Sequence, residues 1–116
     1  MQLSEFFKNV GGDYESALQR LSSESLLDKL IRKFVEEPSY AHLQSALGEG
    51  NAEDAFRAAH TLKGTAASLG LGDLTEAARA VTETLRVGSA PTAEQLQKLD
   101  AAYRVTIENI QLLDAQ

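Results

Sequence analysis

Apolar residues recur along the chain at spacings of three and four, which is the pattern of helices that bury one face. The first such stripe covers residues 3–10 and stops at Gly11–Gly12. A second stripe follows at once and reaches Leu21, and Asp13 stands directly before it, where an N-cap residue belongs. The pattern therefore predicts two short helices at the start of the chain.

A longer stripe begins after Ser22–Ser23, which can cap a helix, and continues to Pro38. The same spacing resumes beyond Pro38 and ends at the GEGN sequence of residues 48–51. The apolar positions of this stripe are Leu26, Leu27, Leu30, Ile31, Phe34, Tyr40, Leu43, Ala46 and Leu47. Because proline lacks the backbone N–H and crowds the preceding turn, we expect one helix that is kinked or interrupted at Pro38.

Three further stripes each begin with the signature of a capped helix. The pairs that form these signatures are Asn51 with Asp54, Asp73 with Glu76, and Thr92 with Gln95. The helices that follow should extend to Gly70, to Gly88 and past Ile110. Their connections are short, which favours antiparallel neighbours. We therefore predict an all-α fold: an antiparallel up-and-down four-helix bundle over residues 23–114, with a cap of short helices over residues 1–22, in a single domain of residues 1–116.

Composition narrows the chemistry that such a bundle can carry. The chain has 116 residues and no cysteine, so disulfides, zinc–cysteine sites and thiol nucleophiles are excluded. Its 17 acidic and 11 basic residues give a net charge of −6, and the basic residues are scattered, so nucleic acid is not an expected partner. The sequence has neither a signal peptide nor an apolar run of about 18 residues. We expect a cytoplasmic protein without a membrane segment.

The helix predicted after Asn51 has two distinct faces when its residues are placed at about 100° each. The apolar face consists of Ala55, Ala58, Ala59, Leu62, Ala66 and Leu69. The opposite face consists of His60, Lys63, Gly64 and Ala67, with Phe56 and Arg57 one turn earlier. His60 should therefore point to solvent or to a partner rather than into the core.

Two features set this second face apart from an ordinary solvated one. It has little bulk next to His60, because Gly64 and Ala67 follow, although a glycine inside a helix costs about 1 kcal/mol relative to alanine. In addition, a neutral histidine can act as a nucleophile, and the ammonium of Lys63 can stabilise an incoming phosphoryl group. An ordinary surface histidine is the alternative. A metal site that joins His60 to His42 lacks further ligands, so we predict no bound metal.

The sequence AAHTLKGTAASLGL, residues 58–71, resembles the signature of the histidine-containing phosphotransfer (HPt) domain: His-x-(Leu, Ile or Phe)-Lys-Gly, then small residues and a leucine–glycine turn. The resemblance spans roughly residues 23–87. It implies that His60 receives a phosphoryl group from an aspartyl phosphate of a response-regulator receiver and passes it to another receiver. Lys63 would offset the charge of that group, and Gly64 would let the receiver approach. From the residues on this face of the helix, we predict partner-binding positions at Phe56, Arg57, Gly64 and Ala67.

The resemblance also implies partners and cofactors. The partners would be receiver domains, a hybrid histidine kinase, or both, and the receiver would supply magnesium, so the chain needs no cofactor of its own. We expect a monomeric phosphocarrier rather than an enzyme, because the sequence has no paired carboxylates, Ser-His-Asp set or glycine-rich phosphate loop. Two alternatives stay open: an adaptor that carries no phosphate, and the phosphorylation domain of a chemotaxis-type kinase. The initial methionine and the finished last helix favour a stand-alone protein.

Overall fold

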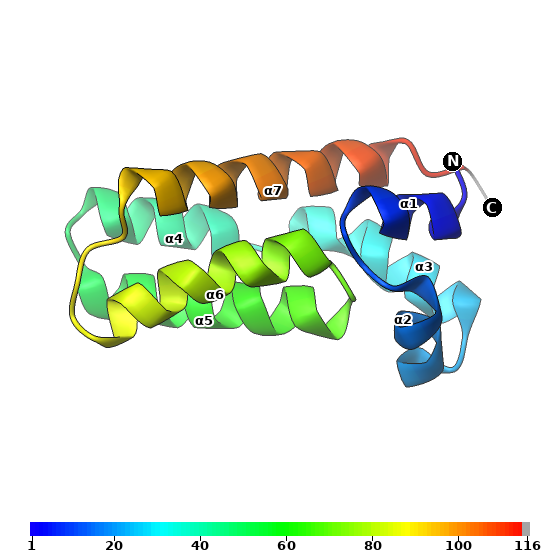
Figure 1. Cartoon of the computed structure of the whole chain (residues 1–116), viewed down its shortest axis with the longest axis horizontal. Helices are drawn as coiled ribbons and strands as arrows, with labels where there is room; N and C mark the ends of the chain where they lie inside the picture. The colour runs from blue at the N-terminus through cyan, green and yellow to red at the C-terminus, as the bar shows by residue number, and fades with distance from the viewer. Residues whose placement is uncertain (115–116) are drawn as a thin grey trace.

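All regular elements of the described chain, residues 1–114 of this computed structural model, are helices (Figure 1). Their bounds are α1 Leu3–Asn9, α2 Tyr14–Leu21, α3 Glu24–Lys33, the 3-10 turn η1 Phe34–Glu36, α4 Ser39–Gly48, α5 Ala52–Ser68, α6 Gly72–Arg86 and α7 Ala93–Gln111. The prediction of an all-α fold is confirmed. The same residues contain no helix that is both long and apolar enough to span a membrane.

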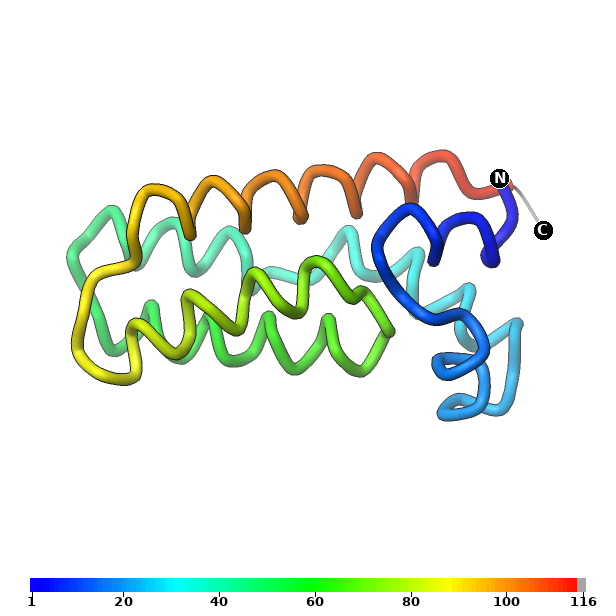
Figure 2. Tube along the Cα trace, in the orientation of Figure 1, coloured from blue at the N-terminus to red at the C-terminus, as the bar shows by residue number. Residues whose placement is uncertain are grey.

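The long helices form a bundle, and the molecule as a whole is elongated, with extents of 42 × 23 × 21 Å. The chain reverses direction between α4 and α5, between α5 and α6, and again between α6 and α7, as the trace in Figure 2 shows. Helix α3 extends the line of α4 beyond the break, and α1 and α2 lie at that end of the bundle, where the N-terminus and the end of α7 also lie (Figure 1). This is the predicted antiparallel up-and-down bundle, with α3 and α4 together forming its first helix.

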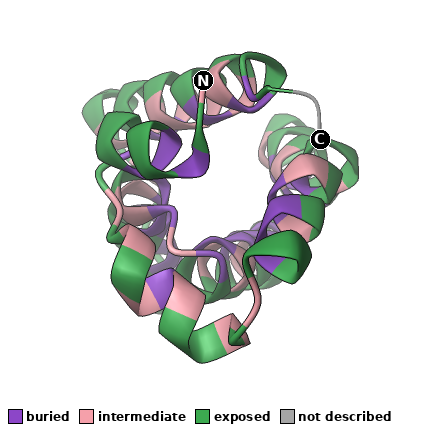
Figure 3. Cartoon of the chain, turned by 90° about the vertical axis from the view of Figure 1, so that its right-hand side faces the viewer, coloured by how far each residue is buried: buried purple, intermediate pink, exposed green. Residues whose placement is uncertain are grey.

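Buried residues lie on the sides of the helices that face the middle of the bundle, as the end-on view in Figure 3 shows. A single apolar cluster includes side chains of α1 as well as of the long helices, and Phe6 and Phe7 are almost fully buried in it. The two rings pack edge to face with centroids 5.4 Å apart. Residues 115 and 116 of the predicted single domain lie outside the described residues, and the division at residue 22 stays a prediction.

Helix capping follows the sequence signals at four of the predicted starts. The side chains of Asp13, Ser23 and Asn51 each accept a hydrogen bond from the backbone N–H three residues later. Thr92 and Gln95 form a full capping box, in which each side chain bonds the backbone of the other residue. These helix starts are determined locally, because the capping side chain and the backbone N–H that donates to it lie within one helical turn.

The predicted cap at Asp73 is wrong. Helix α6 begins at Gly72, two residues earlier than a cap at Asp73 would place it, and no side chain caps it. The backbone N–H of Asp73 instead donates to the carbonyl of Val10, at 3.0 Å. The Asp73 carboxylate lies against Gly11, where an added β-carbon would be 2.1 Å from its Oδ1. A tertiary contact with the turn between α1 and α2 therefore takes the place of the local cap.

The interruption of the first bundle helix is confirmed, but it begins before Pro38. Helix α3 ends at Lys33, and the turn η1 follows it. The Glu37 carboxylate then accepts hydrogen bonds from the backbone N–H of Ser39, at 2.6 Å, and from its hydroxyl, at 3.0 Å. This carboxylate satisfies donors at the start of α4, which proline cannot cap with a side chain. Leu26, expected on the buried stripe of α3, is 42% exposed, because Leu27 and Ile31 occupy the centre of that stripe.

Two stacked tyrosines join α4 to α7. The rings of Tyr40 and Tyr103 are nearly parallel, at 6°, with centroids 3.9 Å apart. The Tyr40 hydroxyl donates to Asp100, at 2.5 Å. Burial, followed by this bond to Asp100, raises the pKa of Tyr40 to about 12, and the same bond lowers the pKa of Asp100. Tyr103 also lies 6.1 Å from Phe34, so the link reaches the 3-10 turn η1.

Candidate functional site

Helix α5 presents the two faces that its sequence predicts. The apolar positions are all buried, with exposed fractions of 7% or less. These are Ala55, Ala58, Ala59, Leu62, Ala66 and, just beyond the helix, Leu69. The small alanines on this face let α4 and α6 pack closely on either side of α5. The position of the helix, and therefore the direction of its other face, is set by these contacts.

The opposite face carries the predicted site residues. His60, Gly64 and Ala67 are exposed, and Lys63 is half-buried. The structure thus brings these residues to one side of one helix and leaves the His60 ring accessible. Gly64 lies in regular helix, and an added β-carbon there would meet no atom within 4 Å. The surface next to His60 is therefore open.

The two basic residues on this face differ in their surroundings. Arg57 is exposed and pairs with Glu53 and Asp54 of its own helix, so carboxylates already balance much of its charge. Lys63 makes no ion pair with any residue in the described part of the chain. Lys63 is therefore the cation on α5 that is available to an incoming anion next to His60.

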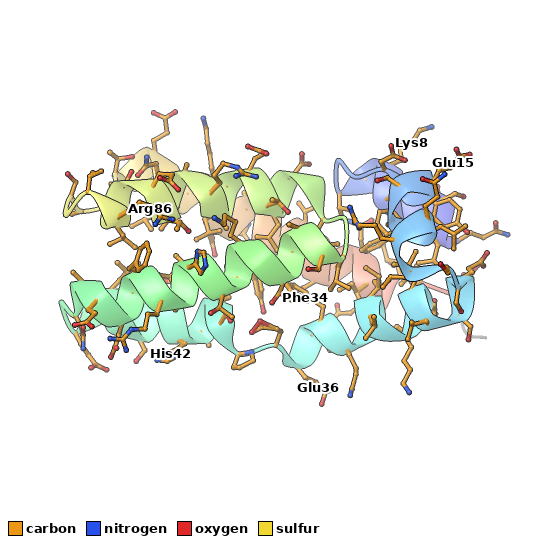
Figure 4. All side chains as sticks on the ribbon, turned by 90° about the horizontal axis from the view of Figure 1, so that it is seen from below. Lys8, Glu15, Phe34, Glu36, His42 and Arg86 are labelled. Atoms are coloured by element: carbon orange, nitrogen blue, oxygen red, sulfur yellow. The ribbon has the colours of Figure 1, made fainter. Side chains whose placement is uncertain are left out.

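A groove of 790 Å³ borders His60 on the side that faces α3 and η1. Leu30, Phe34 and Leu69 supply its apolar part, and Lys33, Glu36 and Glu37 are its charged residues. The α5 side consists of His60, Thr61, Gly64, Thr65 and Ser68. Figure 4 shows Phe34 turned toward α5 and Glu36 pointing outward from the turn. The contribution of η1 was not predicted; the only sequence signal for it is the proline that interrupts the helix.

An aromatic and cationic cluster lies on the other side of His60. The rings of Phe56 and His60 are nearly parallel, at 19°, with centroids 6.0 Å apart. The guanidinium carbon of Arg86, on α6, lies 5.0 Å from the centre of the Phe56 ring. Figure 4 shows Arg86 reaching from α6 toward α5. The sequence analysis did not identify Arg86 as part of the site. A signal was present, because residues at nearly equal distances along the chain from a turn between antiparallel helices lie side by side, and Phe56 and Arg86 are so placed about Gly70.

The second histidine lies elsewhere. His42 is exposed on α4 and does not line the groove. Among residues 1–114, no group of three or more histidine, aspartate or glutamate side chains is arranged to hold a metal ion. Of the two histidines, His60 is therefore the one that lies next to a groove, a lysine without an ion pair among the described residues, and an open helix face.

The fold and this face define a class of protein: a helical bundle that presents one exposed histidine beside a groove and an open helix face. A comparison with protein families agrees, because the model described as "Hpt domain" matches residues 25–115. The chain therefore belongs to the Hpt domain family, the histidine phosphotransfer modules of two-component phosphorelays, which interact with response-regulator receivers. Helices α1 and α2 precede the matched residues. Searches of curated proteins and of solved structures found no significant match.

Proposed function

We propose that His60 accepts a phosphoryl group from an aspartyl phosphate of a response-regulator receiver and passes it to a second receiver. The observation that carries this proposal is the arrangement on α5: an exposed imidazole, a half-buried lysine without an ion pair among the described residues, and an open glycine on one helix face. The family assignment supports histidine phosphotransfer in general.

The chemistry requires one nucleophile and positive charge. An unprotonated nitrogen of the His60 imidazole attacks phosphorus, and a P–N bond forms as the P–O bond of the acyl phosphate breaks. The aspartate carboxylate leaves with the electron pair. The second transfer reverses these roles. Because the transition state of phosphoryl transfer is loose, positioning and electrostatic stabilisation supply most of the catalysis, and Lys63 is placed to offset the charge. Magnesium comes from the receiver, in our proposal.

The receiver docks on the groove beside His60, in our proposal. Leu30, which is half-buried, offers apolar surface for its contact residues beside the almost fully buried Phe34 and Leu69, and the same groove is lined by His60 and Gly64. The earlier prediction placed the partner-binding surface on Phe56, Arg57, Gly64 and Ala67. The groove extends that surface toward α3 and η1. Phe56 and Arg57 both have partners within the chain, so we assign them a smaller share of the docking contacts.

The test is phosphorylation of the purified protein by a panel of radiolabelled phospho-receivers. Wild type should take up label in an acid-labile, base-stable form, and His60→Gln should abolish it. His42→Gln is the matched control, because it removes the other exposed histidine and should keep full labelling. A wild type that binds receivers but never takes up label would contradict the proposal and favour the adaptor. Equal labelling of His60→Gln and wild type would exclude His60 as the acceptor.

A further inference from the structure

The Phe56 ring is placed to restrict the orientation of the imidazole. Phe56 and His60 are separated by one helical turn, so their side chains lie on the same face of α5. At 6.0 Å and 19°, the two rings are in the offset, nearly parallel arrangement that aromatic pairs favour. Phe56 itself is half-buried and packs against the core, which limits its own movement. An exposed histidine without such a neighbour would sample several rotamers.

Arg86 secures this arrangement from a second helix. Its guanidinium lies 5.0 Å from the centre of the Phe56 ring, within the range of a cation–π interaction. Its Nε also donates to the Glu83 carboxylate, at 3.2 Å, and this second contact limits the movement of the side chain. Helices α5 and α6 pack together along their lengths, so the contact from α6 holds Phe56 relative to the bundle and not only to its own helix.

A second arginine on α6, Arg79, serves as a matched control for Arg86. Arg79 lies seven residues before Arg86 on α6 and also pairs with a glutamate three residues earlier, Glu76, at 3.5 Å. Both arginines are exposed and carry the same charge. Of the two, Arg86 is the one in a cation–π contact with a ring of the described chain. A general effect of positive charge on receivers would involve both arginines, whereas an effect on the His60 ring requires Arg86.

We propose that Phe56 and Arg86 are positioning residues for His60: together they hold the imidazole in the orientation that it needs for phosphoryl transfer. The consequence for transfer rests on the proposed function above, whereas the orientation of the ring does not. Phe56 covers the side of the ring away from Gly64, so the accessible side faces the open surface and the groove.

The first readout needs no partner. In NMR spectra of the 116-residue chain, the Phe56 ring current should displace the His60 imidazole proton resonances. Phe56→Leu should remove this displacement, and Arg86→Gln should reduce it because Phe56 becomes freer to move. Arg79→Gln should leave the resonances unchanged, and so should Arg86→Lys, which keeps a cation over the ring. The His42 resonances serve as the internal control in every variant.

The second readout is the rate of transfer from a phosphorylated receiver. Arg86→Gln should slow it by roughly two- to fivefold, the factor that an exposed cation–π contact is worth. Phe56→Leu should slow it at least as much, and Arg86→Lys should restore most of the rate. Far-UV circular dichroism and urea unfolding check that each variant is folded.

Two results would overturn the positioning role: His60 resonances that do not change in Phe56→Leu and Arg86→Gln, or an Arg79→Gln variant that is slowed as much as Arg86→Gln. Displaced resonances together with slower transfer, restored by Arg86→Lys, support it. A wild type that shows the ring-current displacement but accepts no phosphoryl group would refute the proposed function alone. The two proposals therefore fail in distinguishable ways.

Discussion

Two glycines of the same helical hairpin, Gly72 and Gly64, have opposite surroundings. A β-carbon added to Gly72, at the start of α6, would lie 2.1 Å from the carbonyl oxygen of Gly11. One added to Gly12 would lie equally close to the carbonyl of Gly70. A β-carbon on Gly64, in the middle of α5, would meet nothing within 4 Å. Gly12 and Gly72 therefore allow two backbone segments to approach each other within the protein. No contact within the chain requires a glycine at position 64.

This difference separates a requirement of folding from one of function. Gly12 and Gly72 let the turn between α1 and α2 pack against the turn between α5 and α6, and the hydrogen bond from Asp73 to Val10 closes the same contact. Gly64 has no such role, and it lowers helix stability by about 0.5–1 kcal/mol relative to alanine. A cost without a structural benefit, next to an exposed histidine, supports our proposal that another protein approaches this surface closely.

The largest expected effect is on folding. Gly72→Ala places a β-carbon against backbone rather than against a flexible side chain, so the two turns must separate. We expect it to lower the free energy of unfolding by about 2–3 kcal/mol, as overpacking does in well-packed cores. Urea unfolding measures this, with Gly48→Ala as the control, because Gly48 ends α4 in open space. A loss of less than about 0.5 kcal/mol would show that the contact between the two turns can adjust to a β-carbon. The fold would then not require a glycine at position 72.

The next effect is on phosphotransfer. Gly64→Gln adds a long side chain to the surface on which we propose that the receiver docks, and we expect transfer to slow by about tenfold, equivalent to about 1.4 kcal/mol. The protein should remain folded, because the new side chain has space in the free molecule. Gly48→Gln makes the same change far from the groove and should transfer at the wild-type rate. Equal rates for Gly64→Gln and wild type would contradict the role of Gly64.

The smallest effect is a gain. Gly64→Ala should raise the free energy of unfolding by about 0.5–1 kcal/mol, because alanine is the better helix former and its methyl group meets no atom. The midpoint of urea unfolding measures this gain. A destabilised Gly64→Ala variant would mean that the glycine serves the fold after all, and the contrast with Gly72 would disappear.

Much of this protein was predictable because its signals act over short distances. The two faces of α5, and with them the exposure of His60 and Gly64, follow from spacing within one helix. The capped starts at Asp13, Ser23, Asn51 and Thr92 follow from hydrogen bonds that span three residues. The family resemblance likewise rests on a continuous stretch around His60, and the family match includes that stretch.

The tertiary structure alone decided the features that depend on contacts between helices. Asp73 has the sequence of a cap but bonds the turn between α1 and α2, because that turn lies within reach only after folding. The groove beside His60 exists because η1 lies opposite α5 in the folded chain. Arg86 contacts Phe56 because the packing of α6 against α5 places these two residues side by side. Local patterns determine which face of a helix is buried, but the packing of whole helices determines which residues of different helices meet.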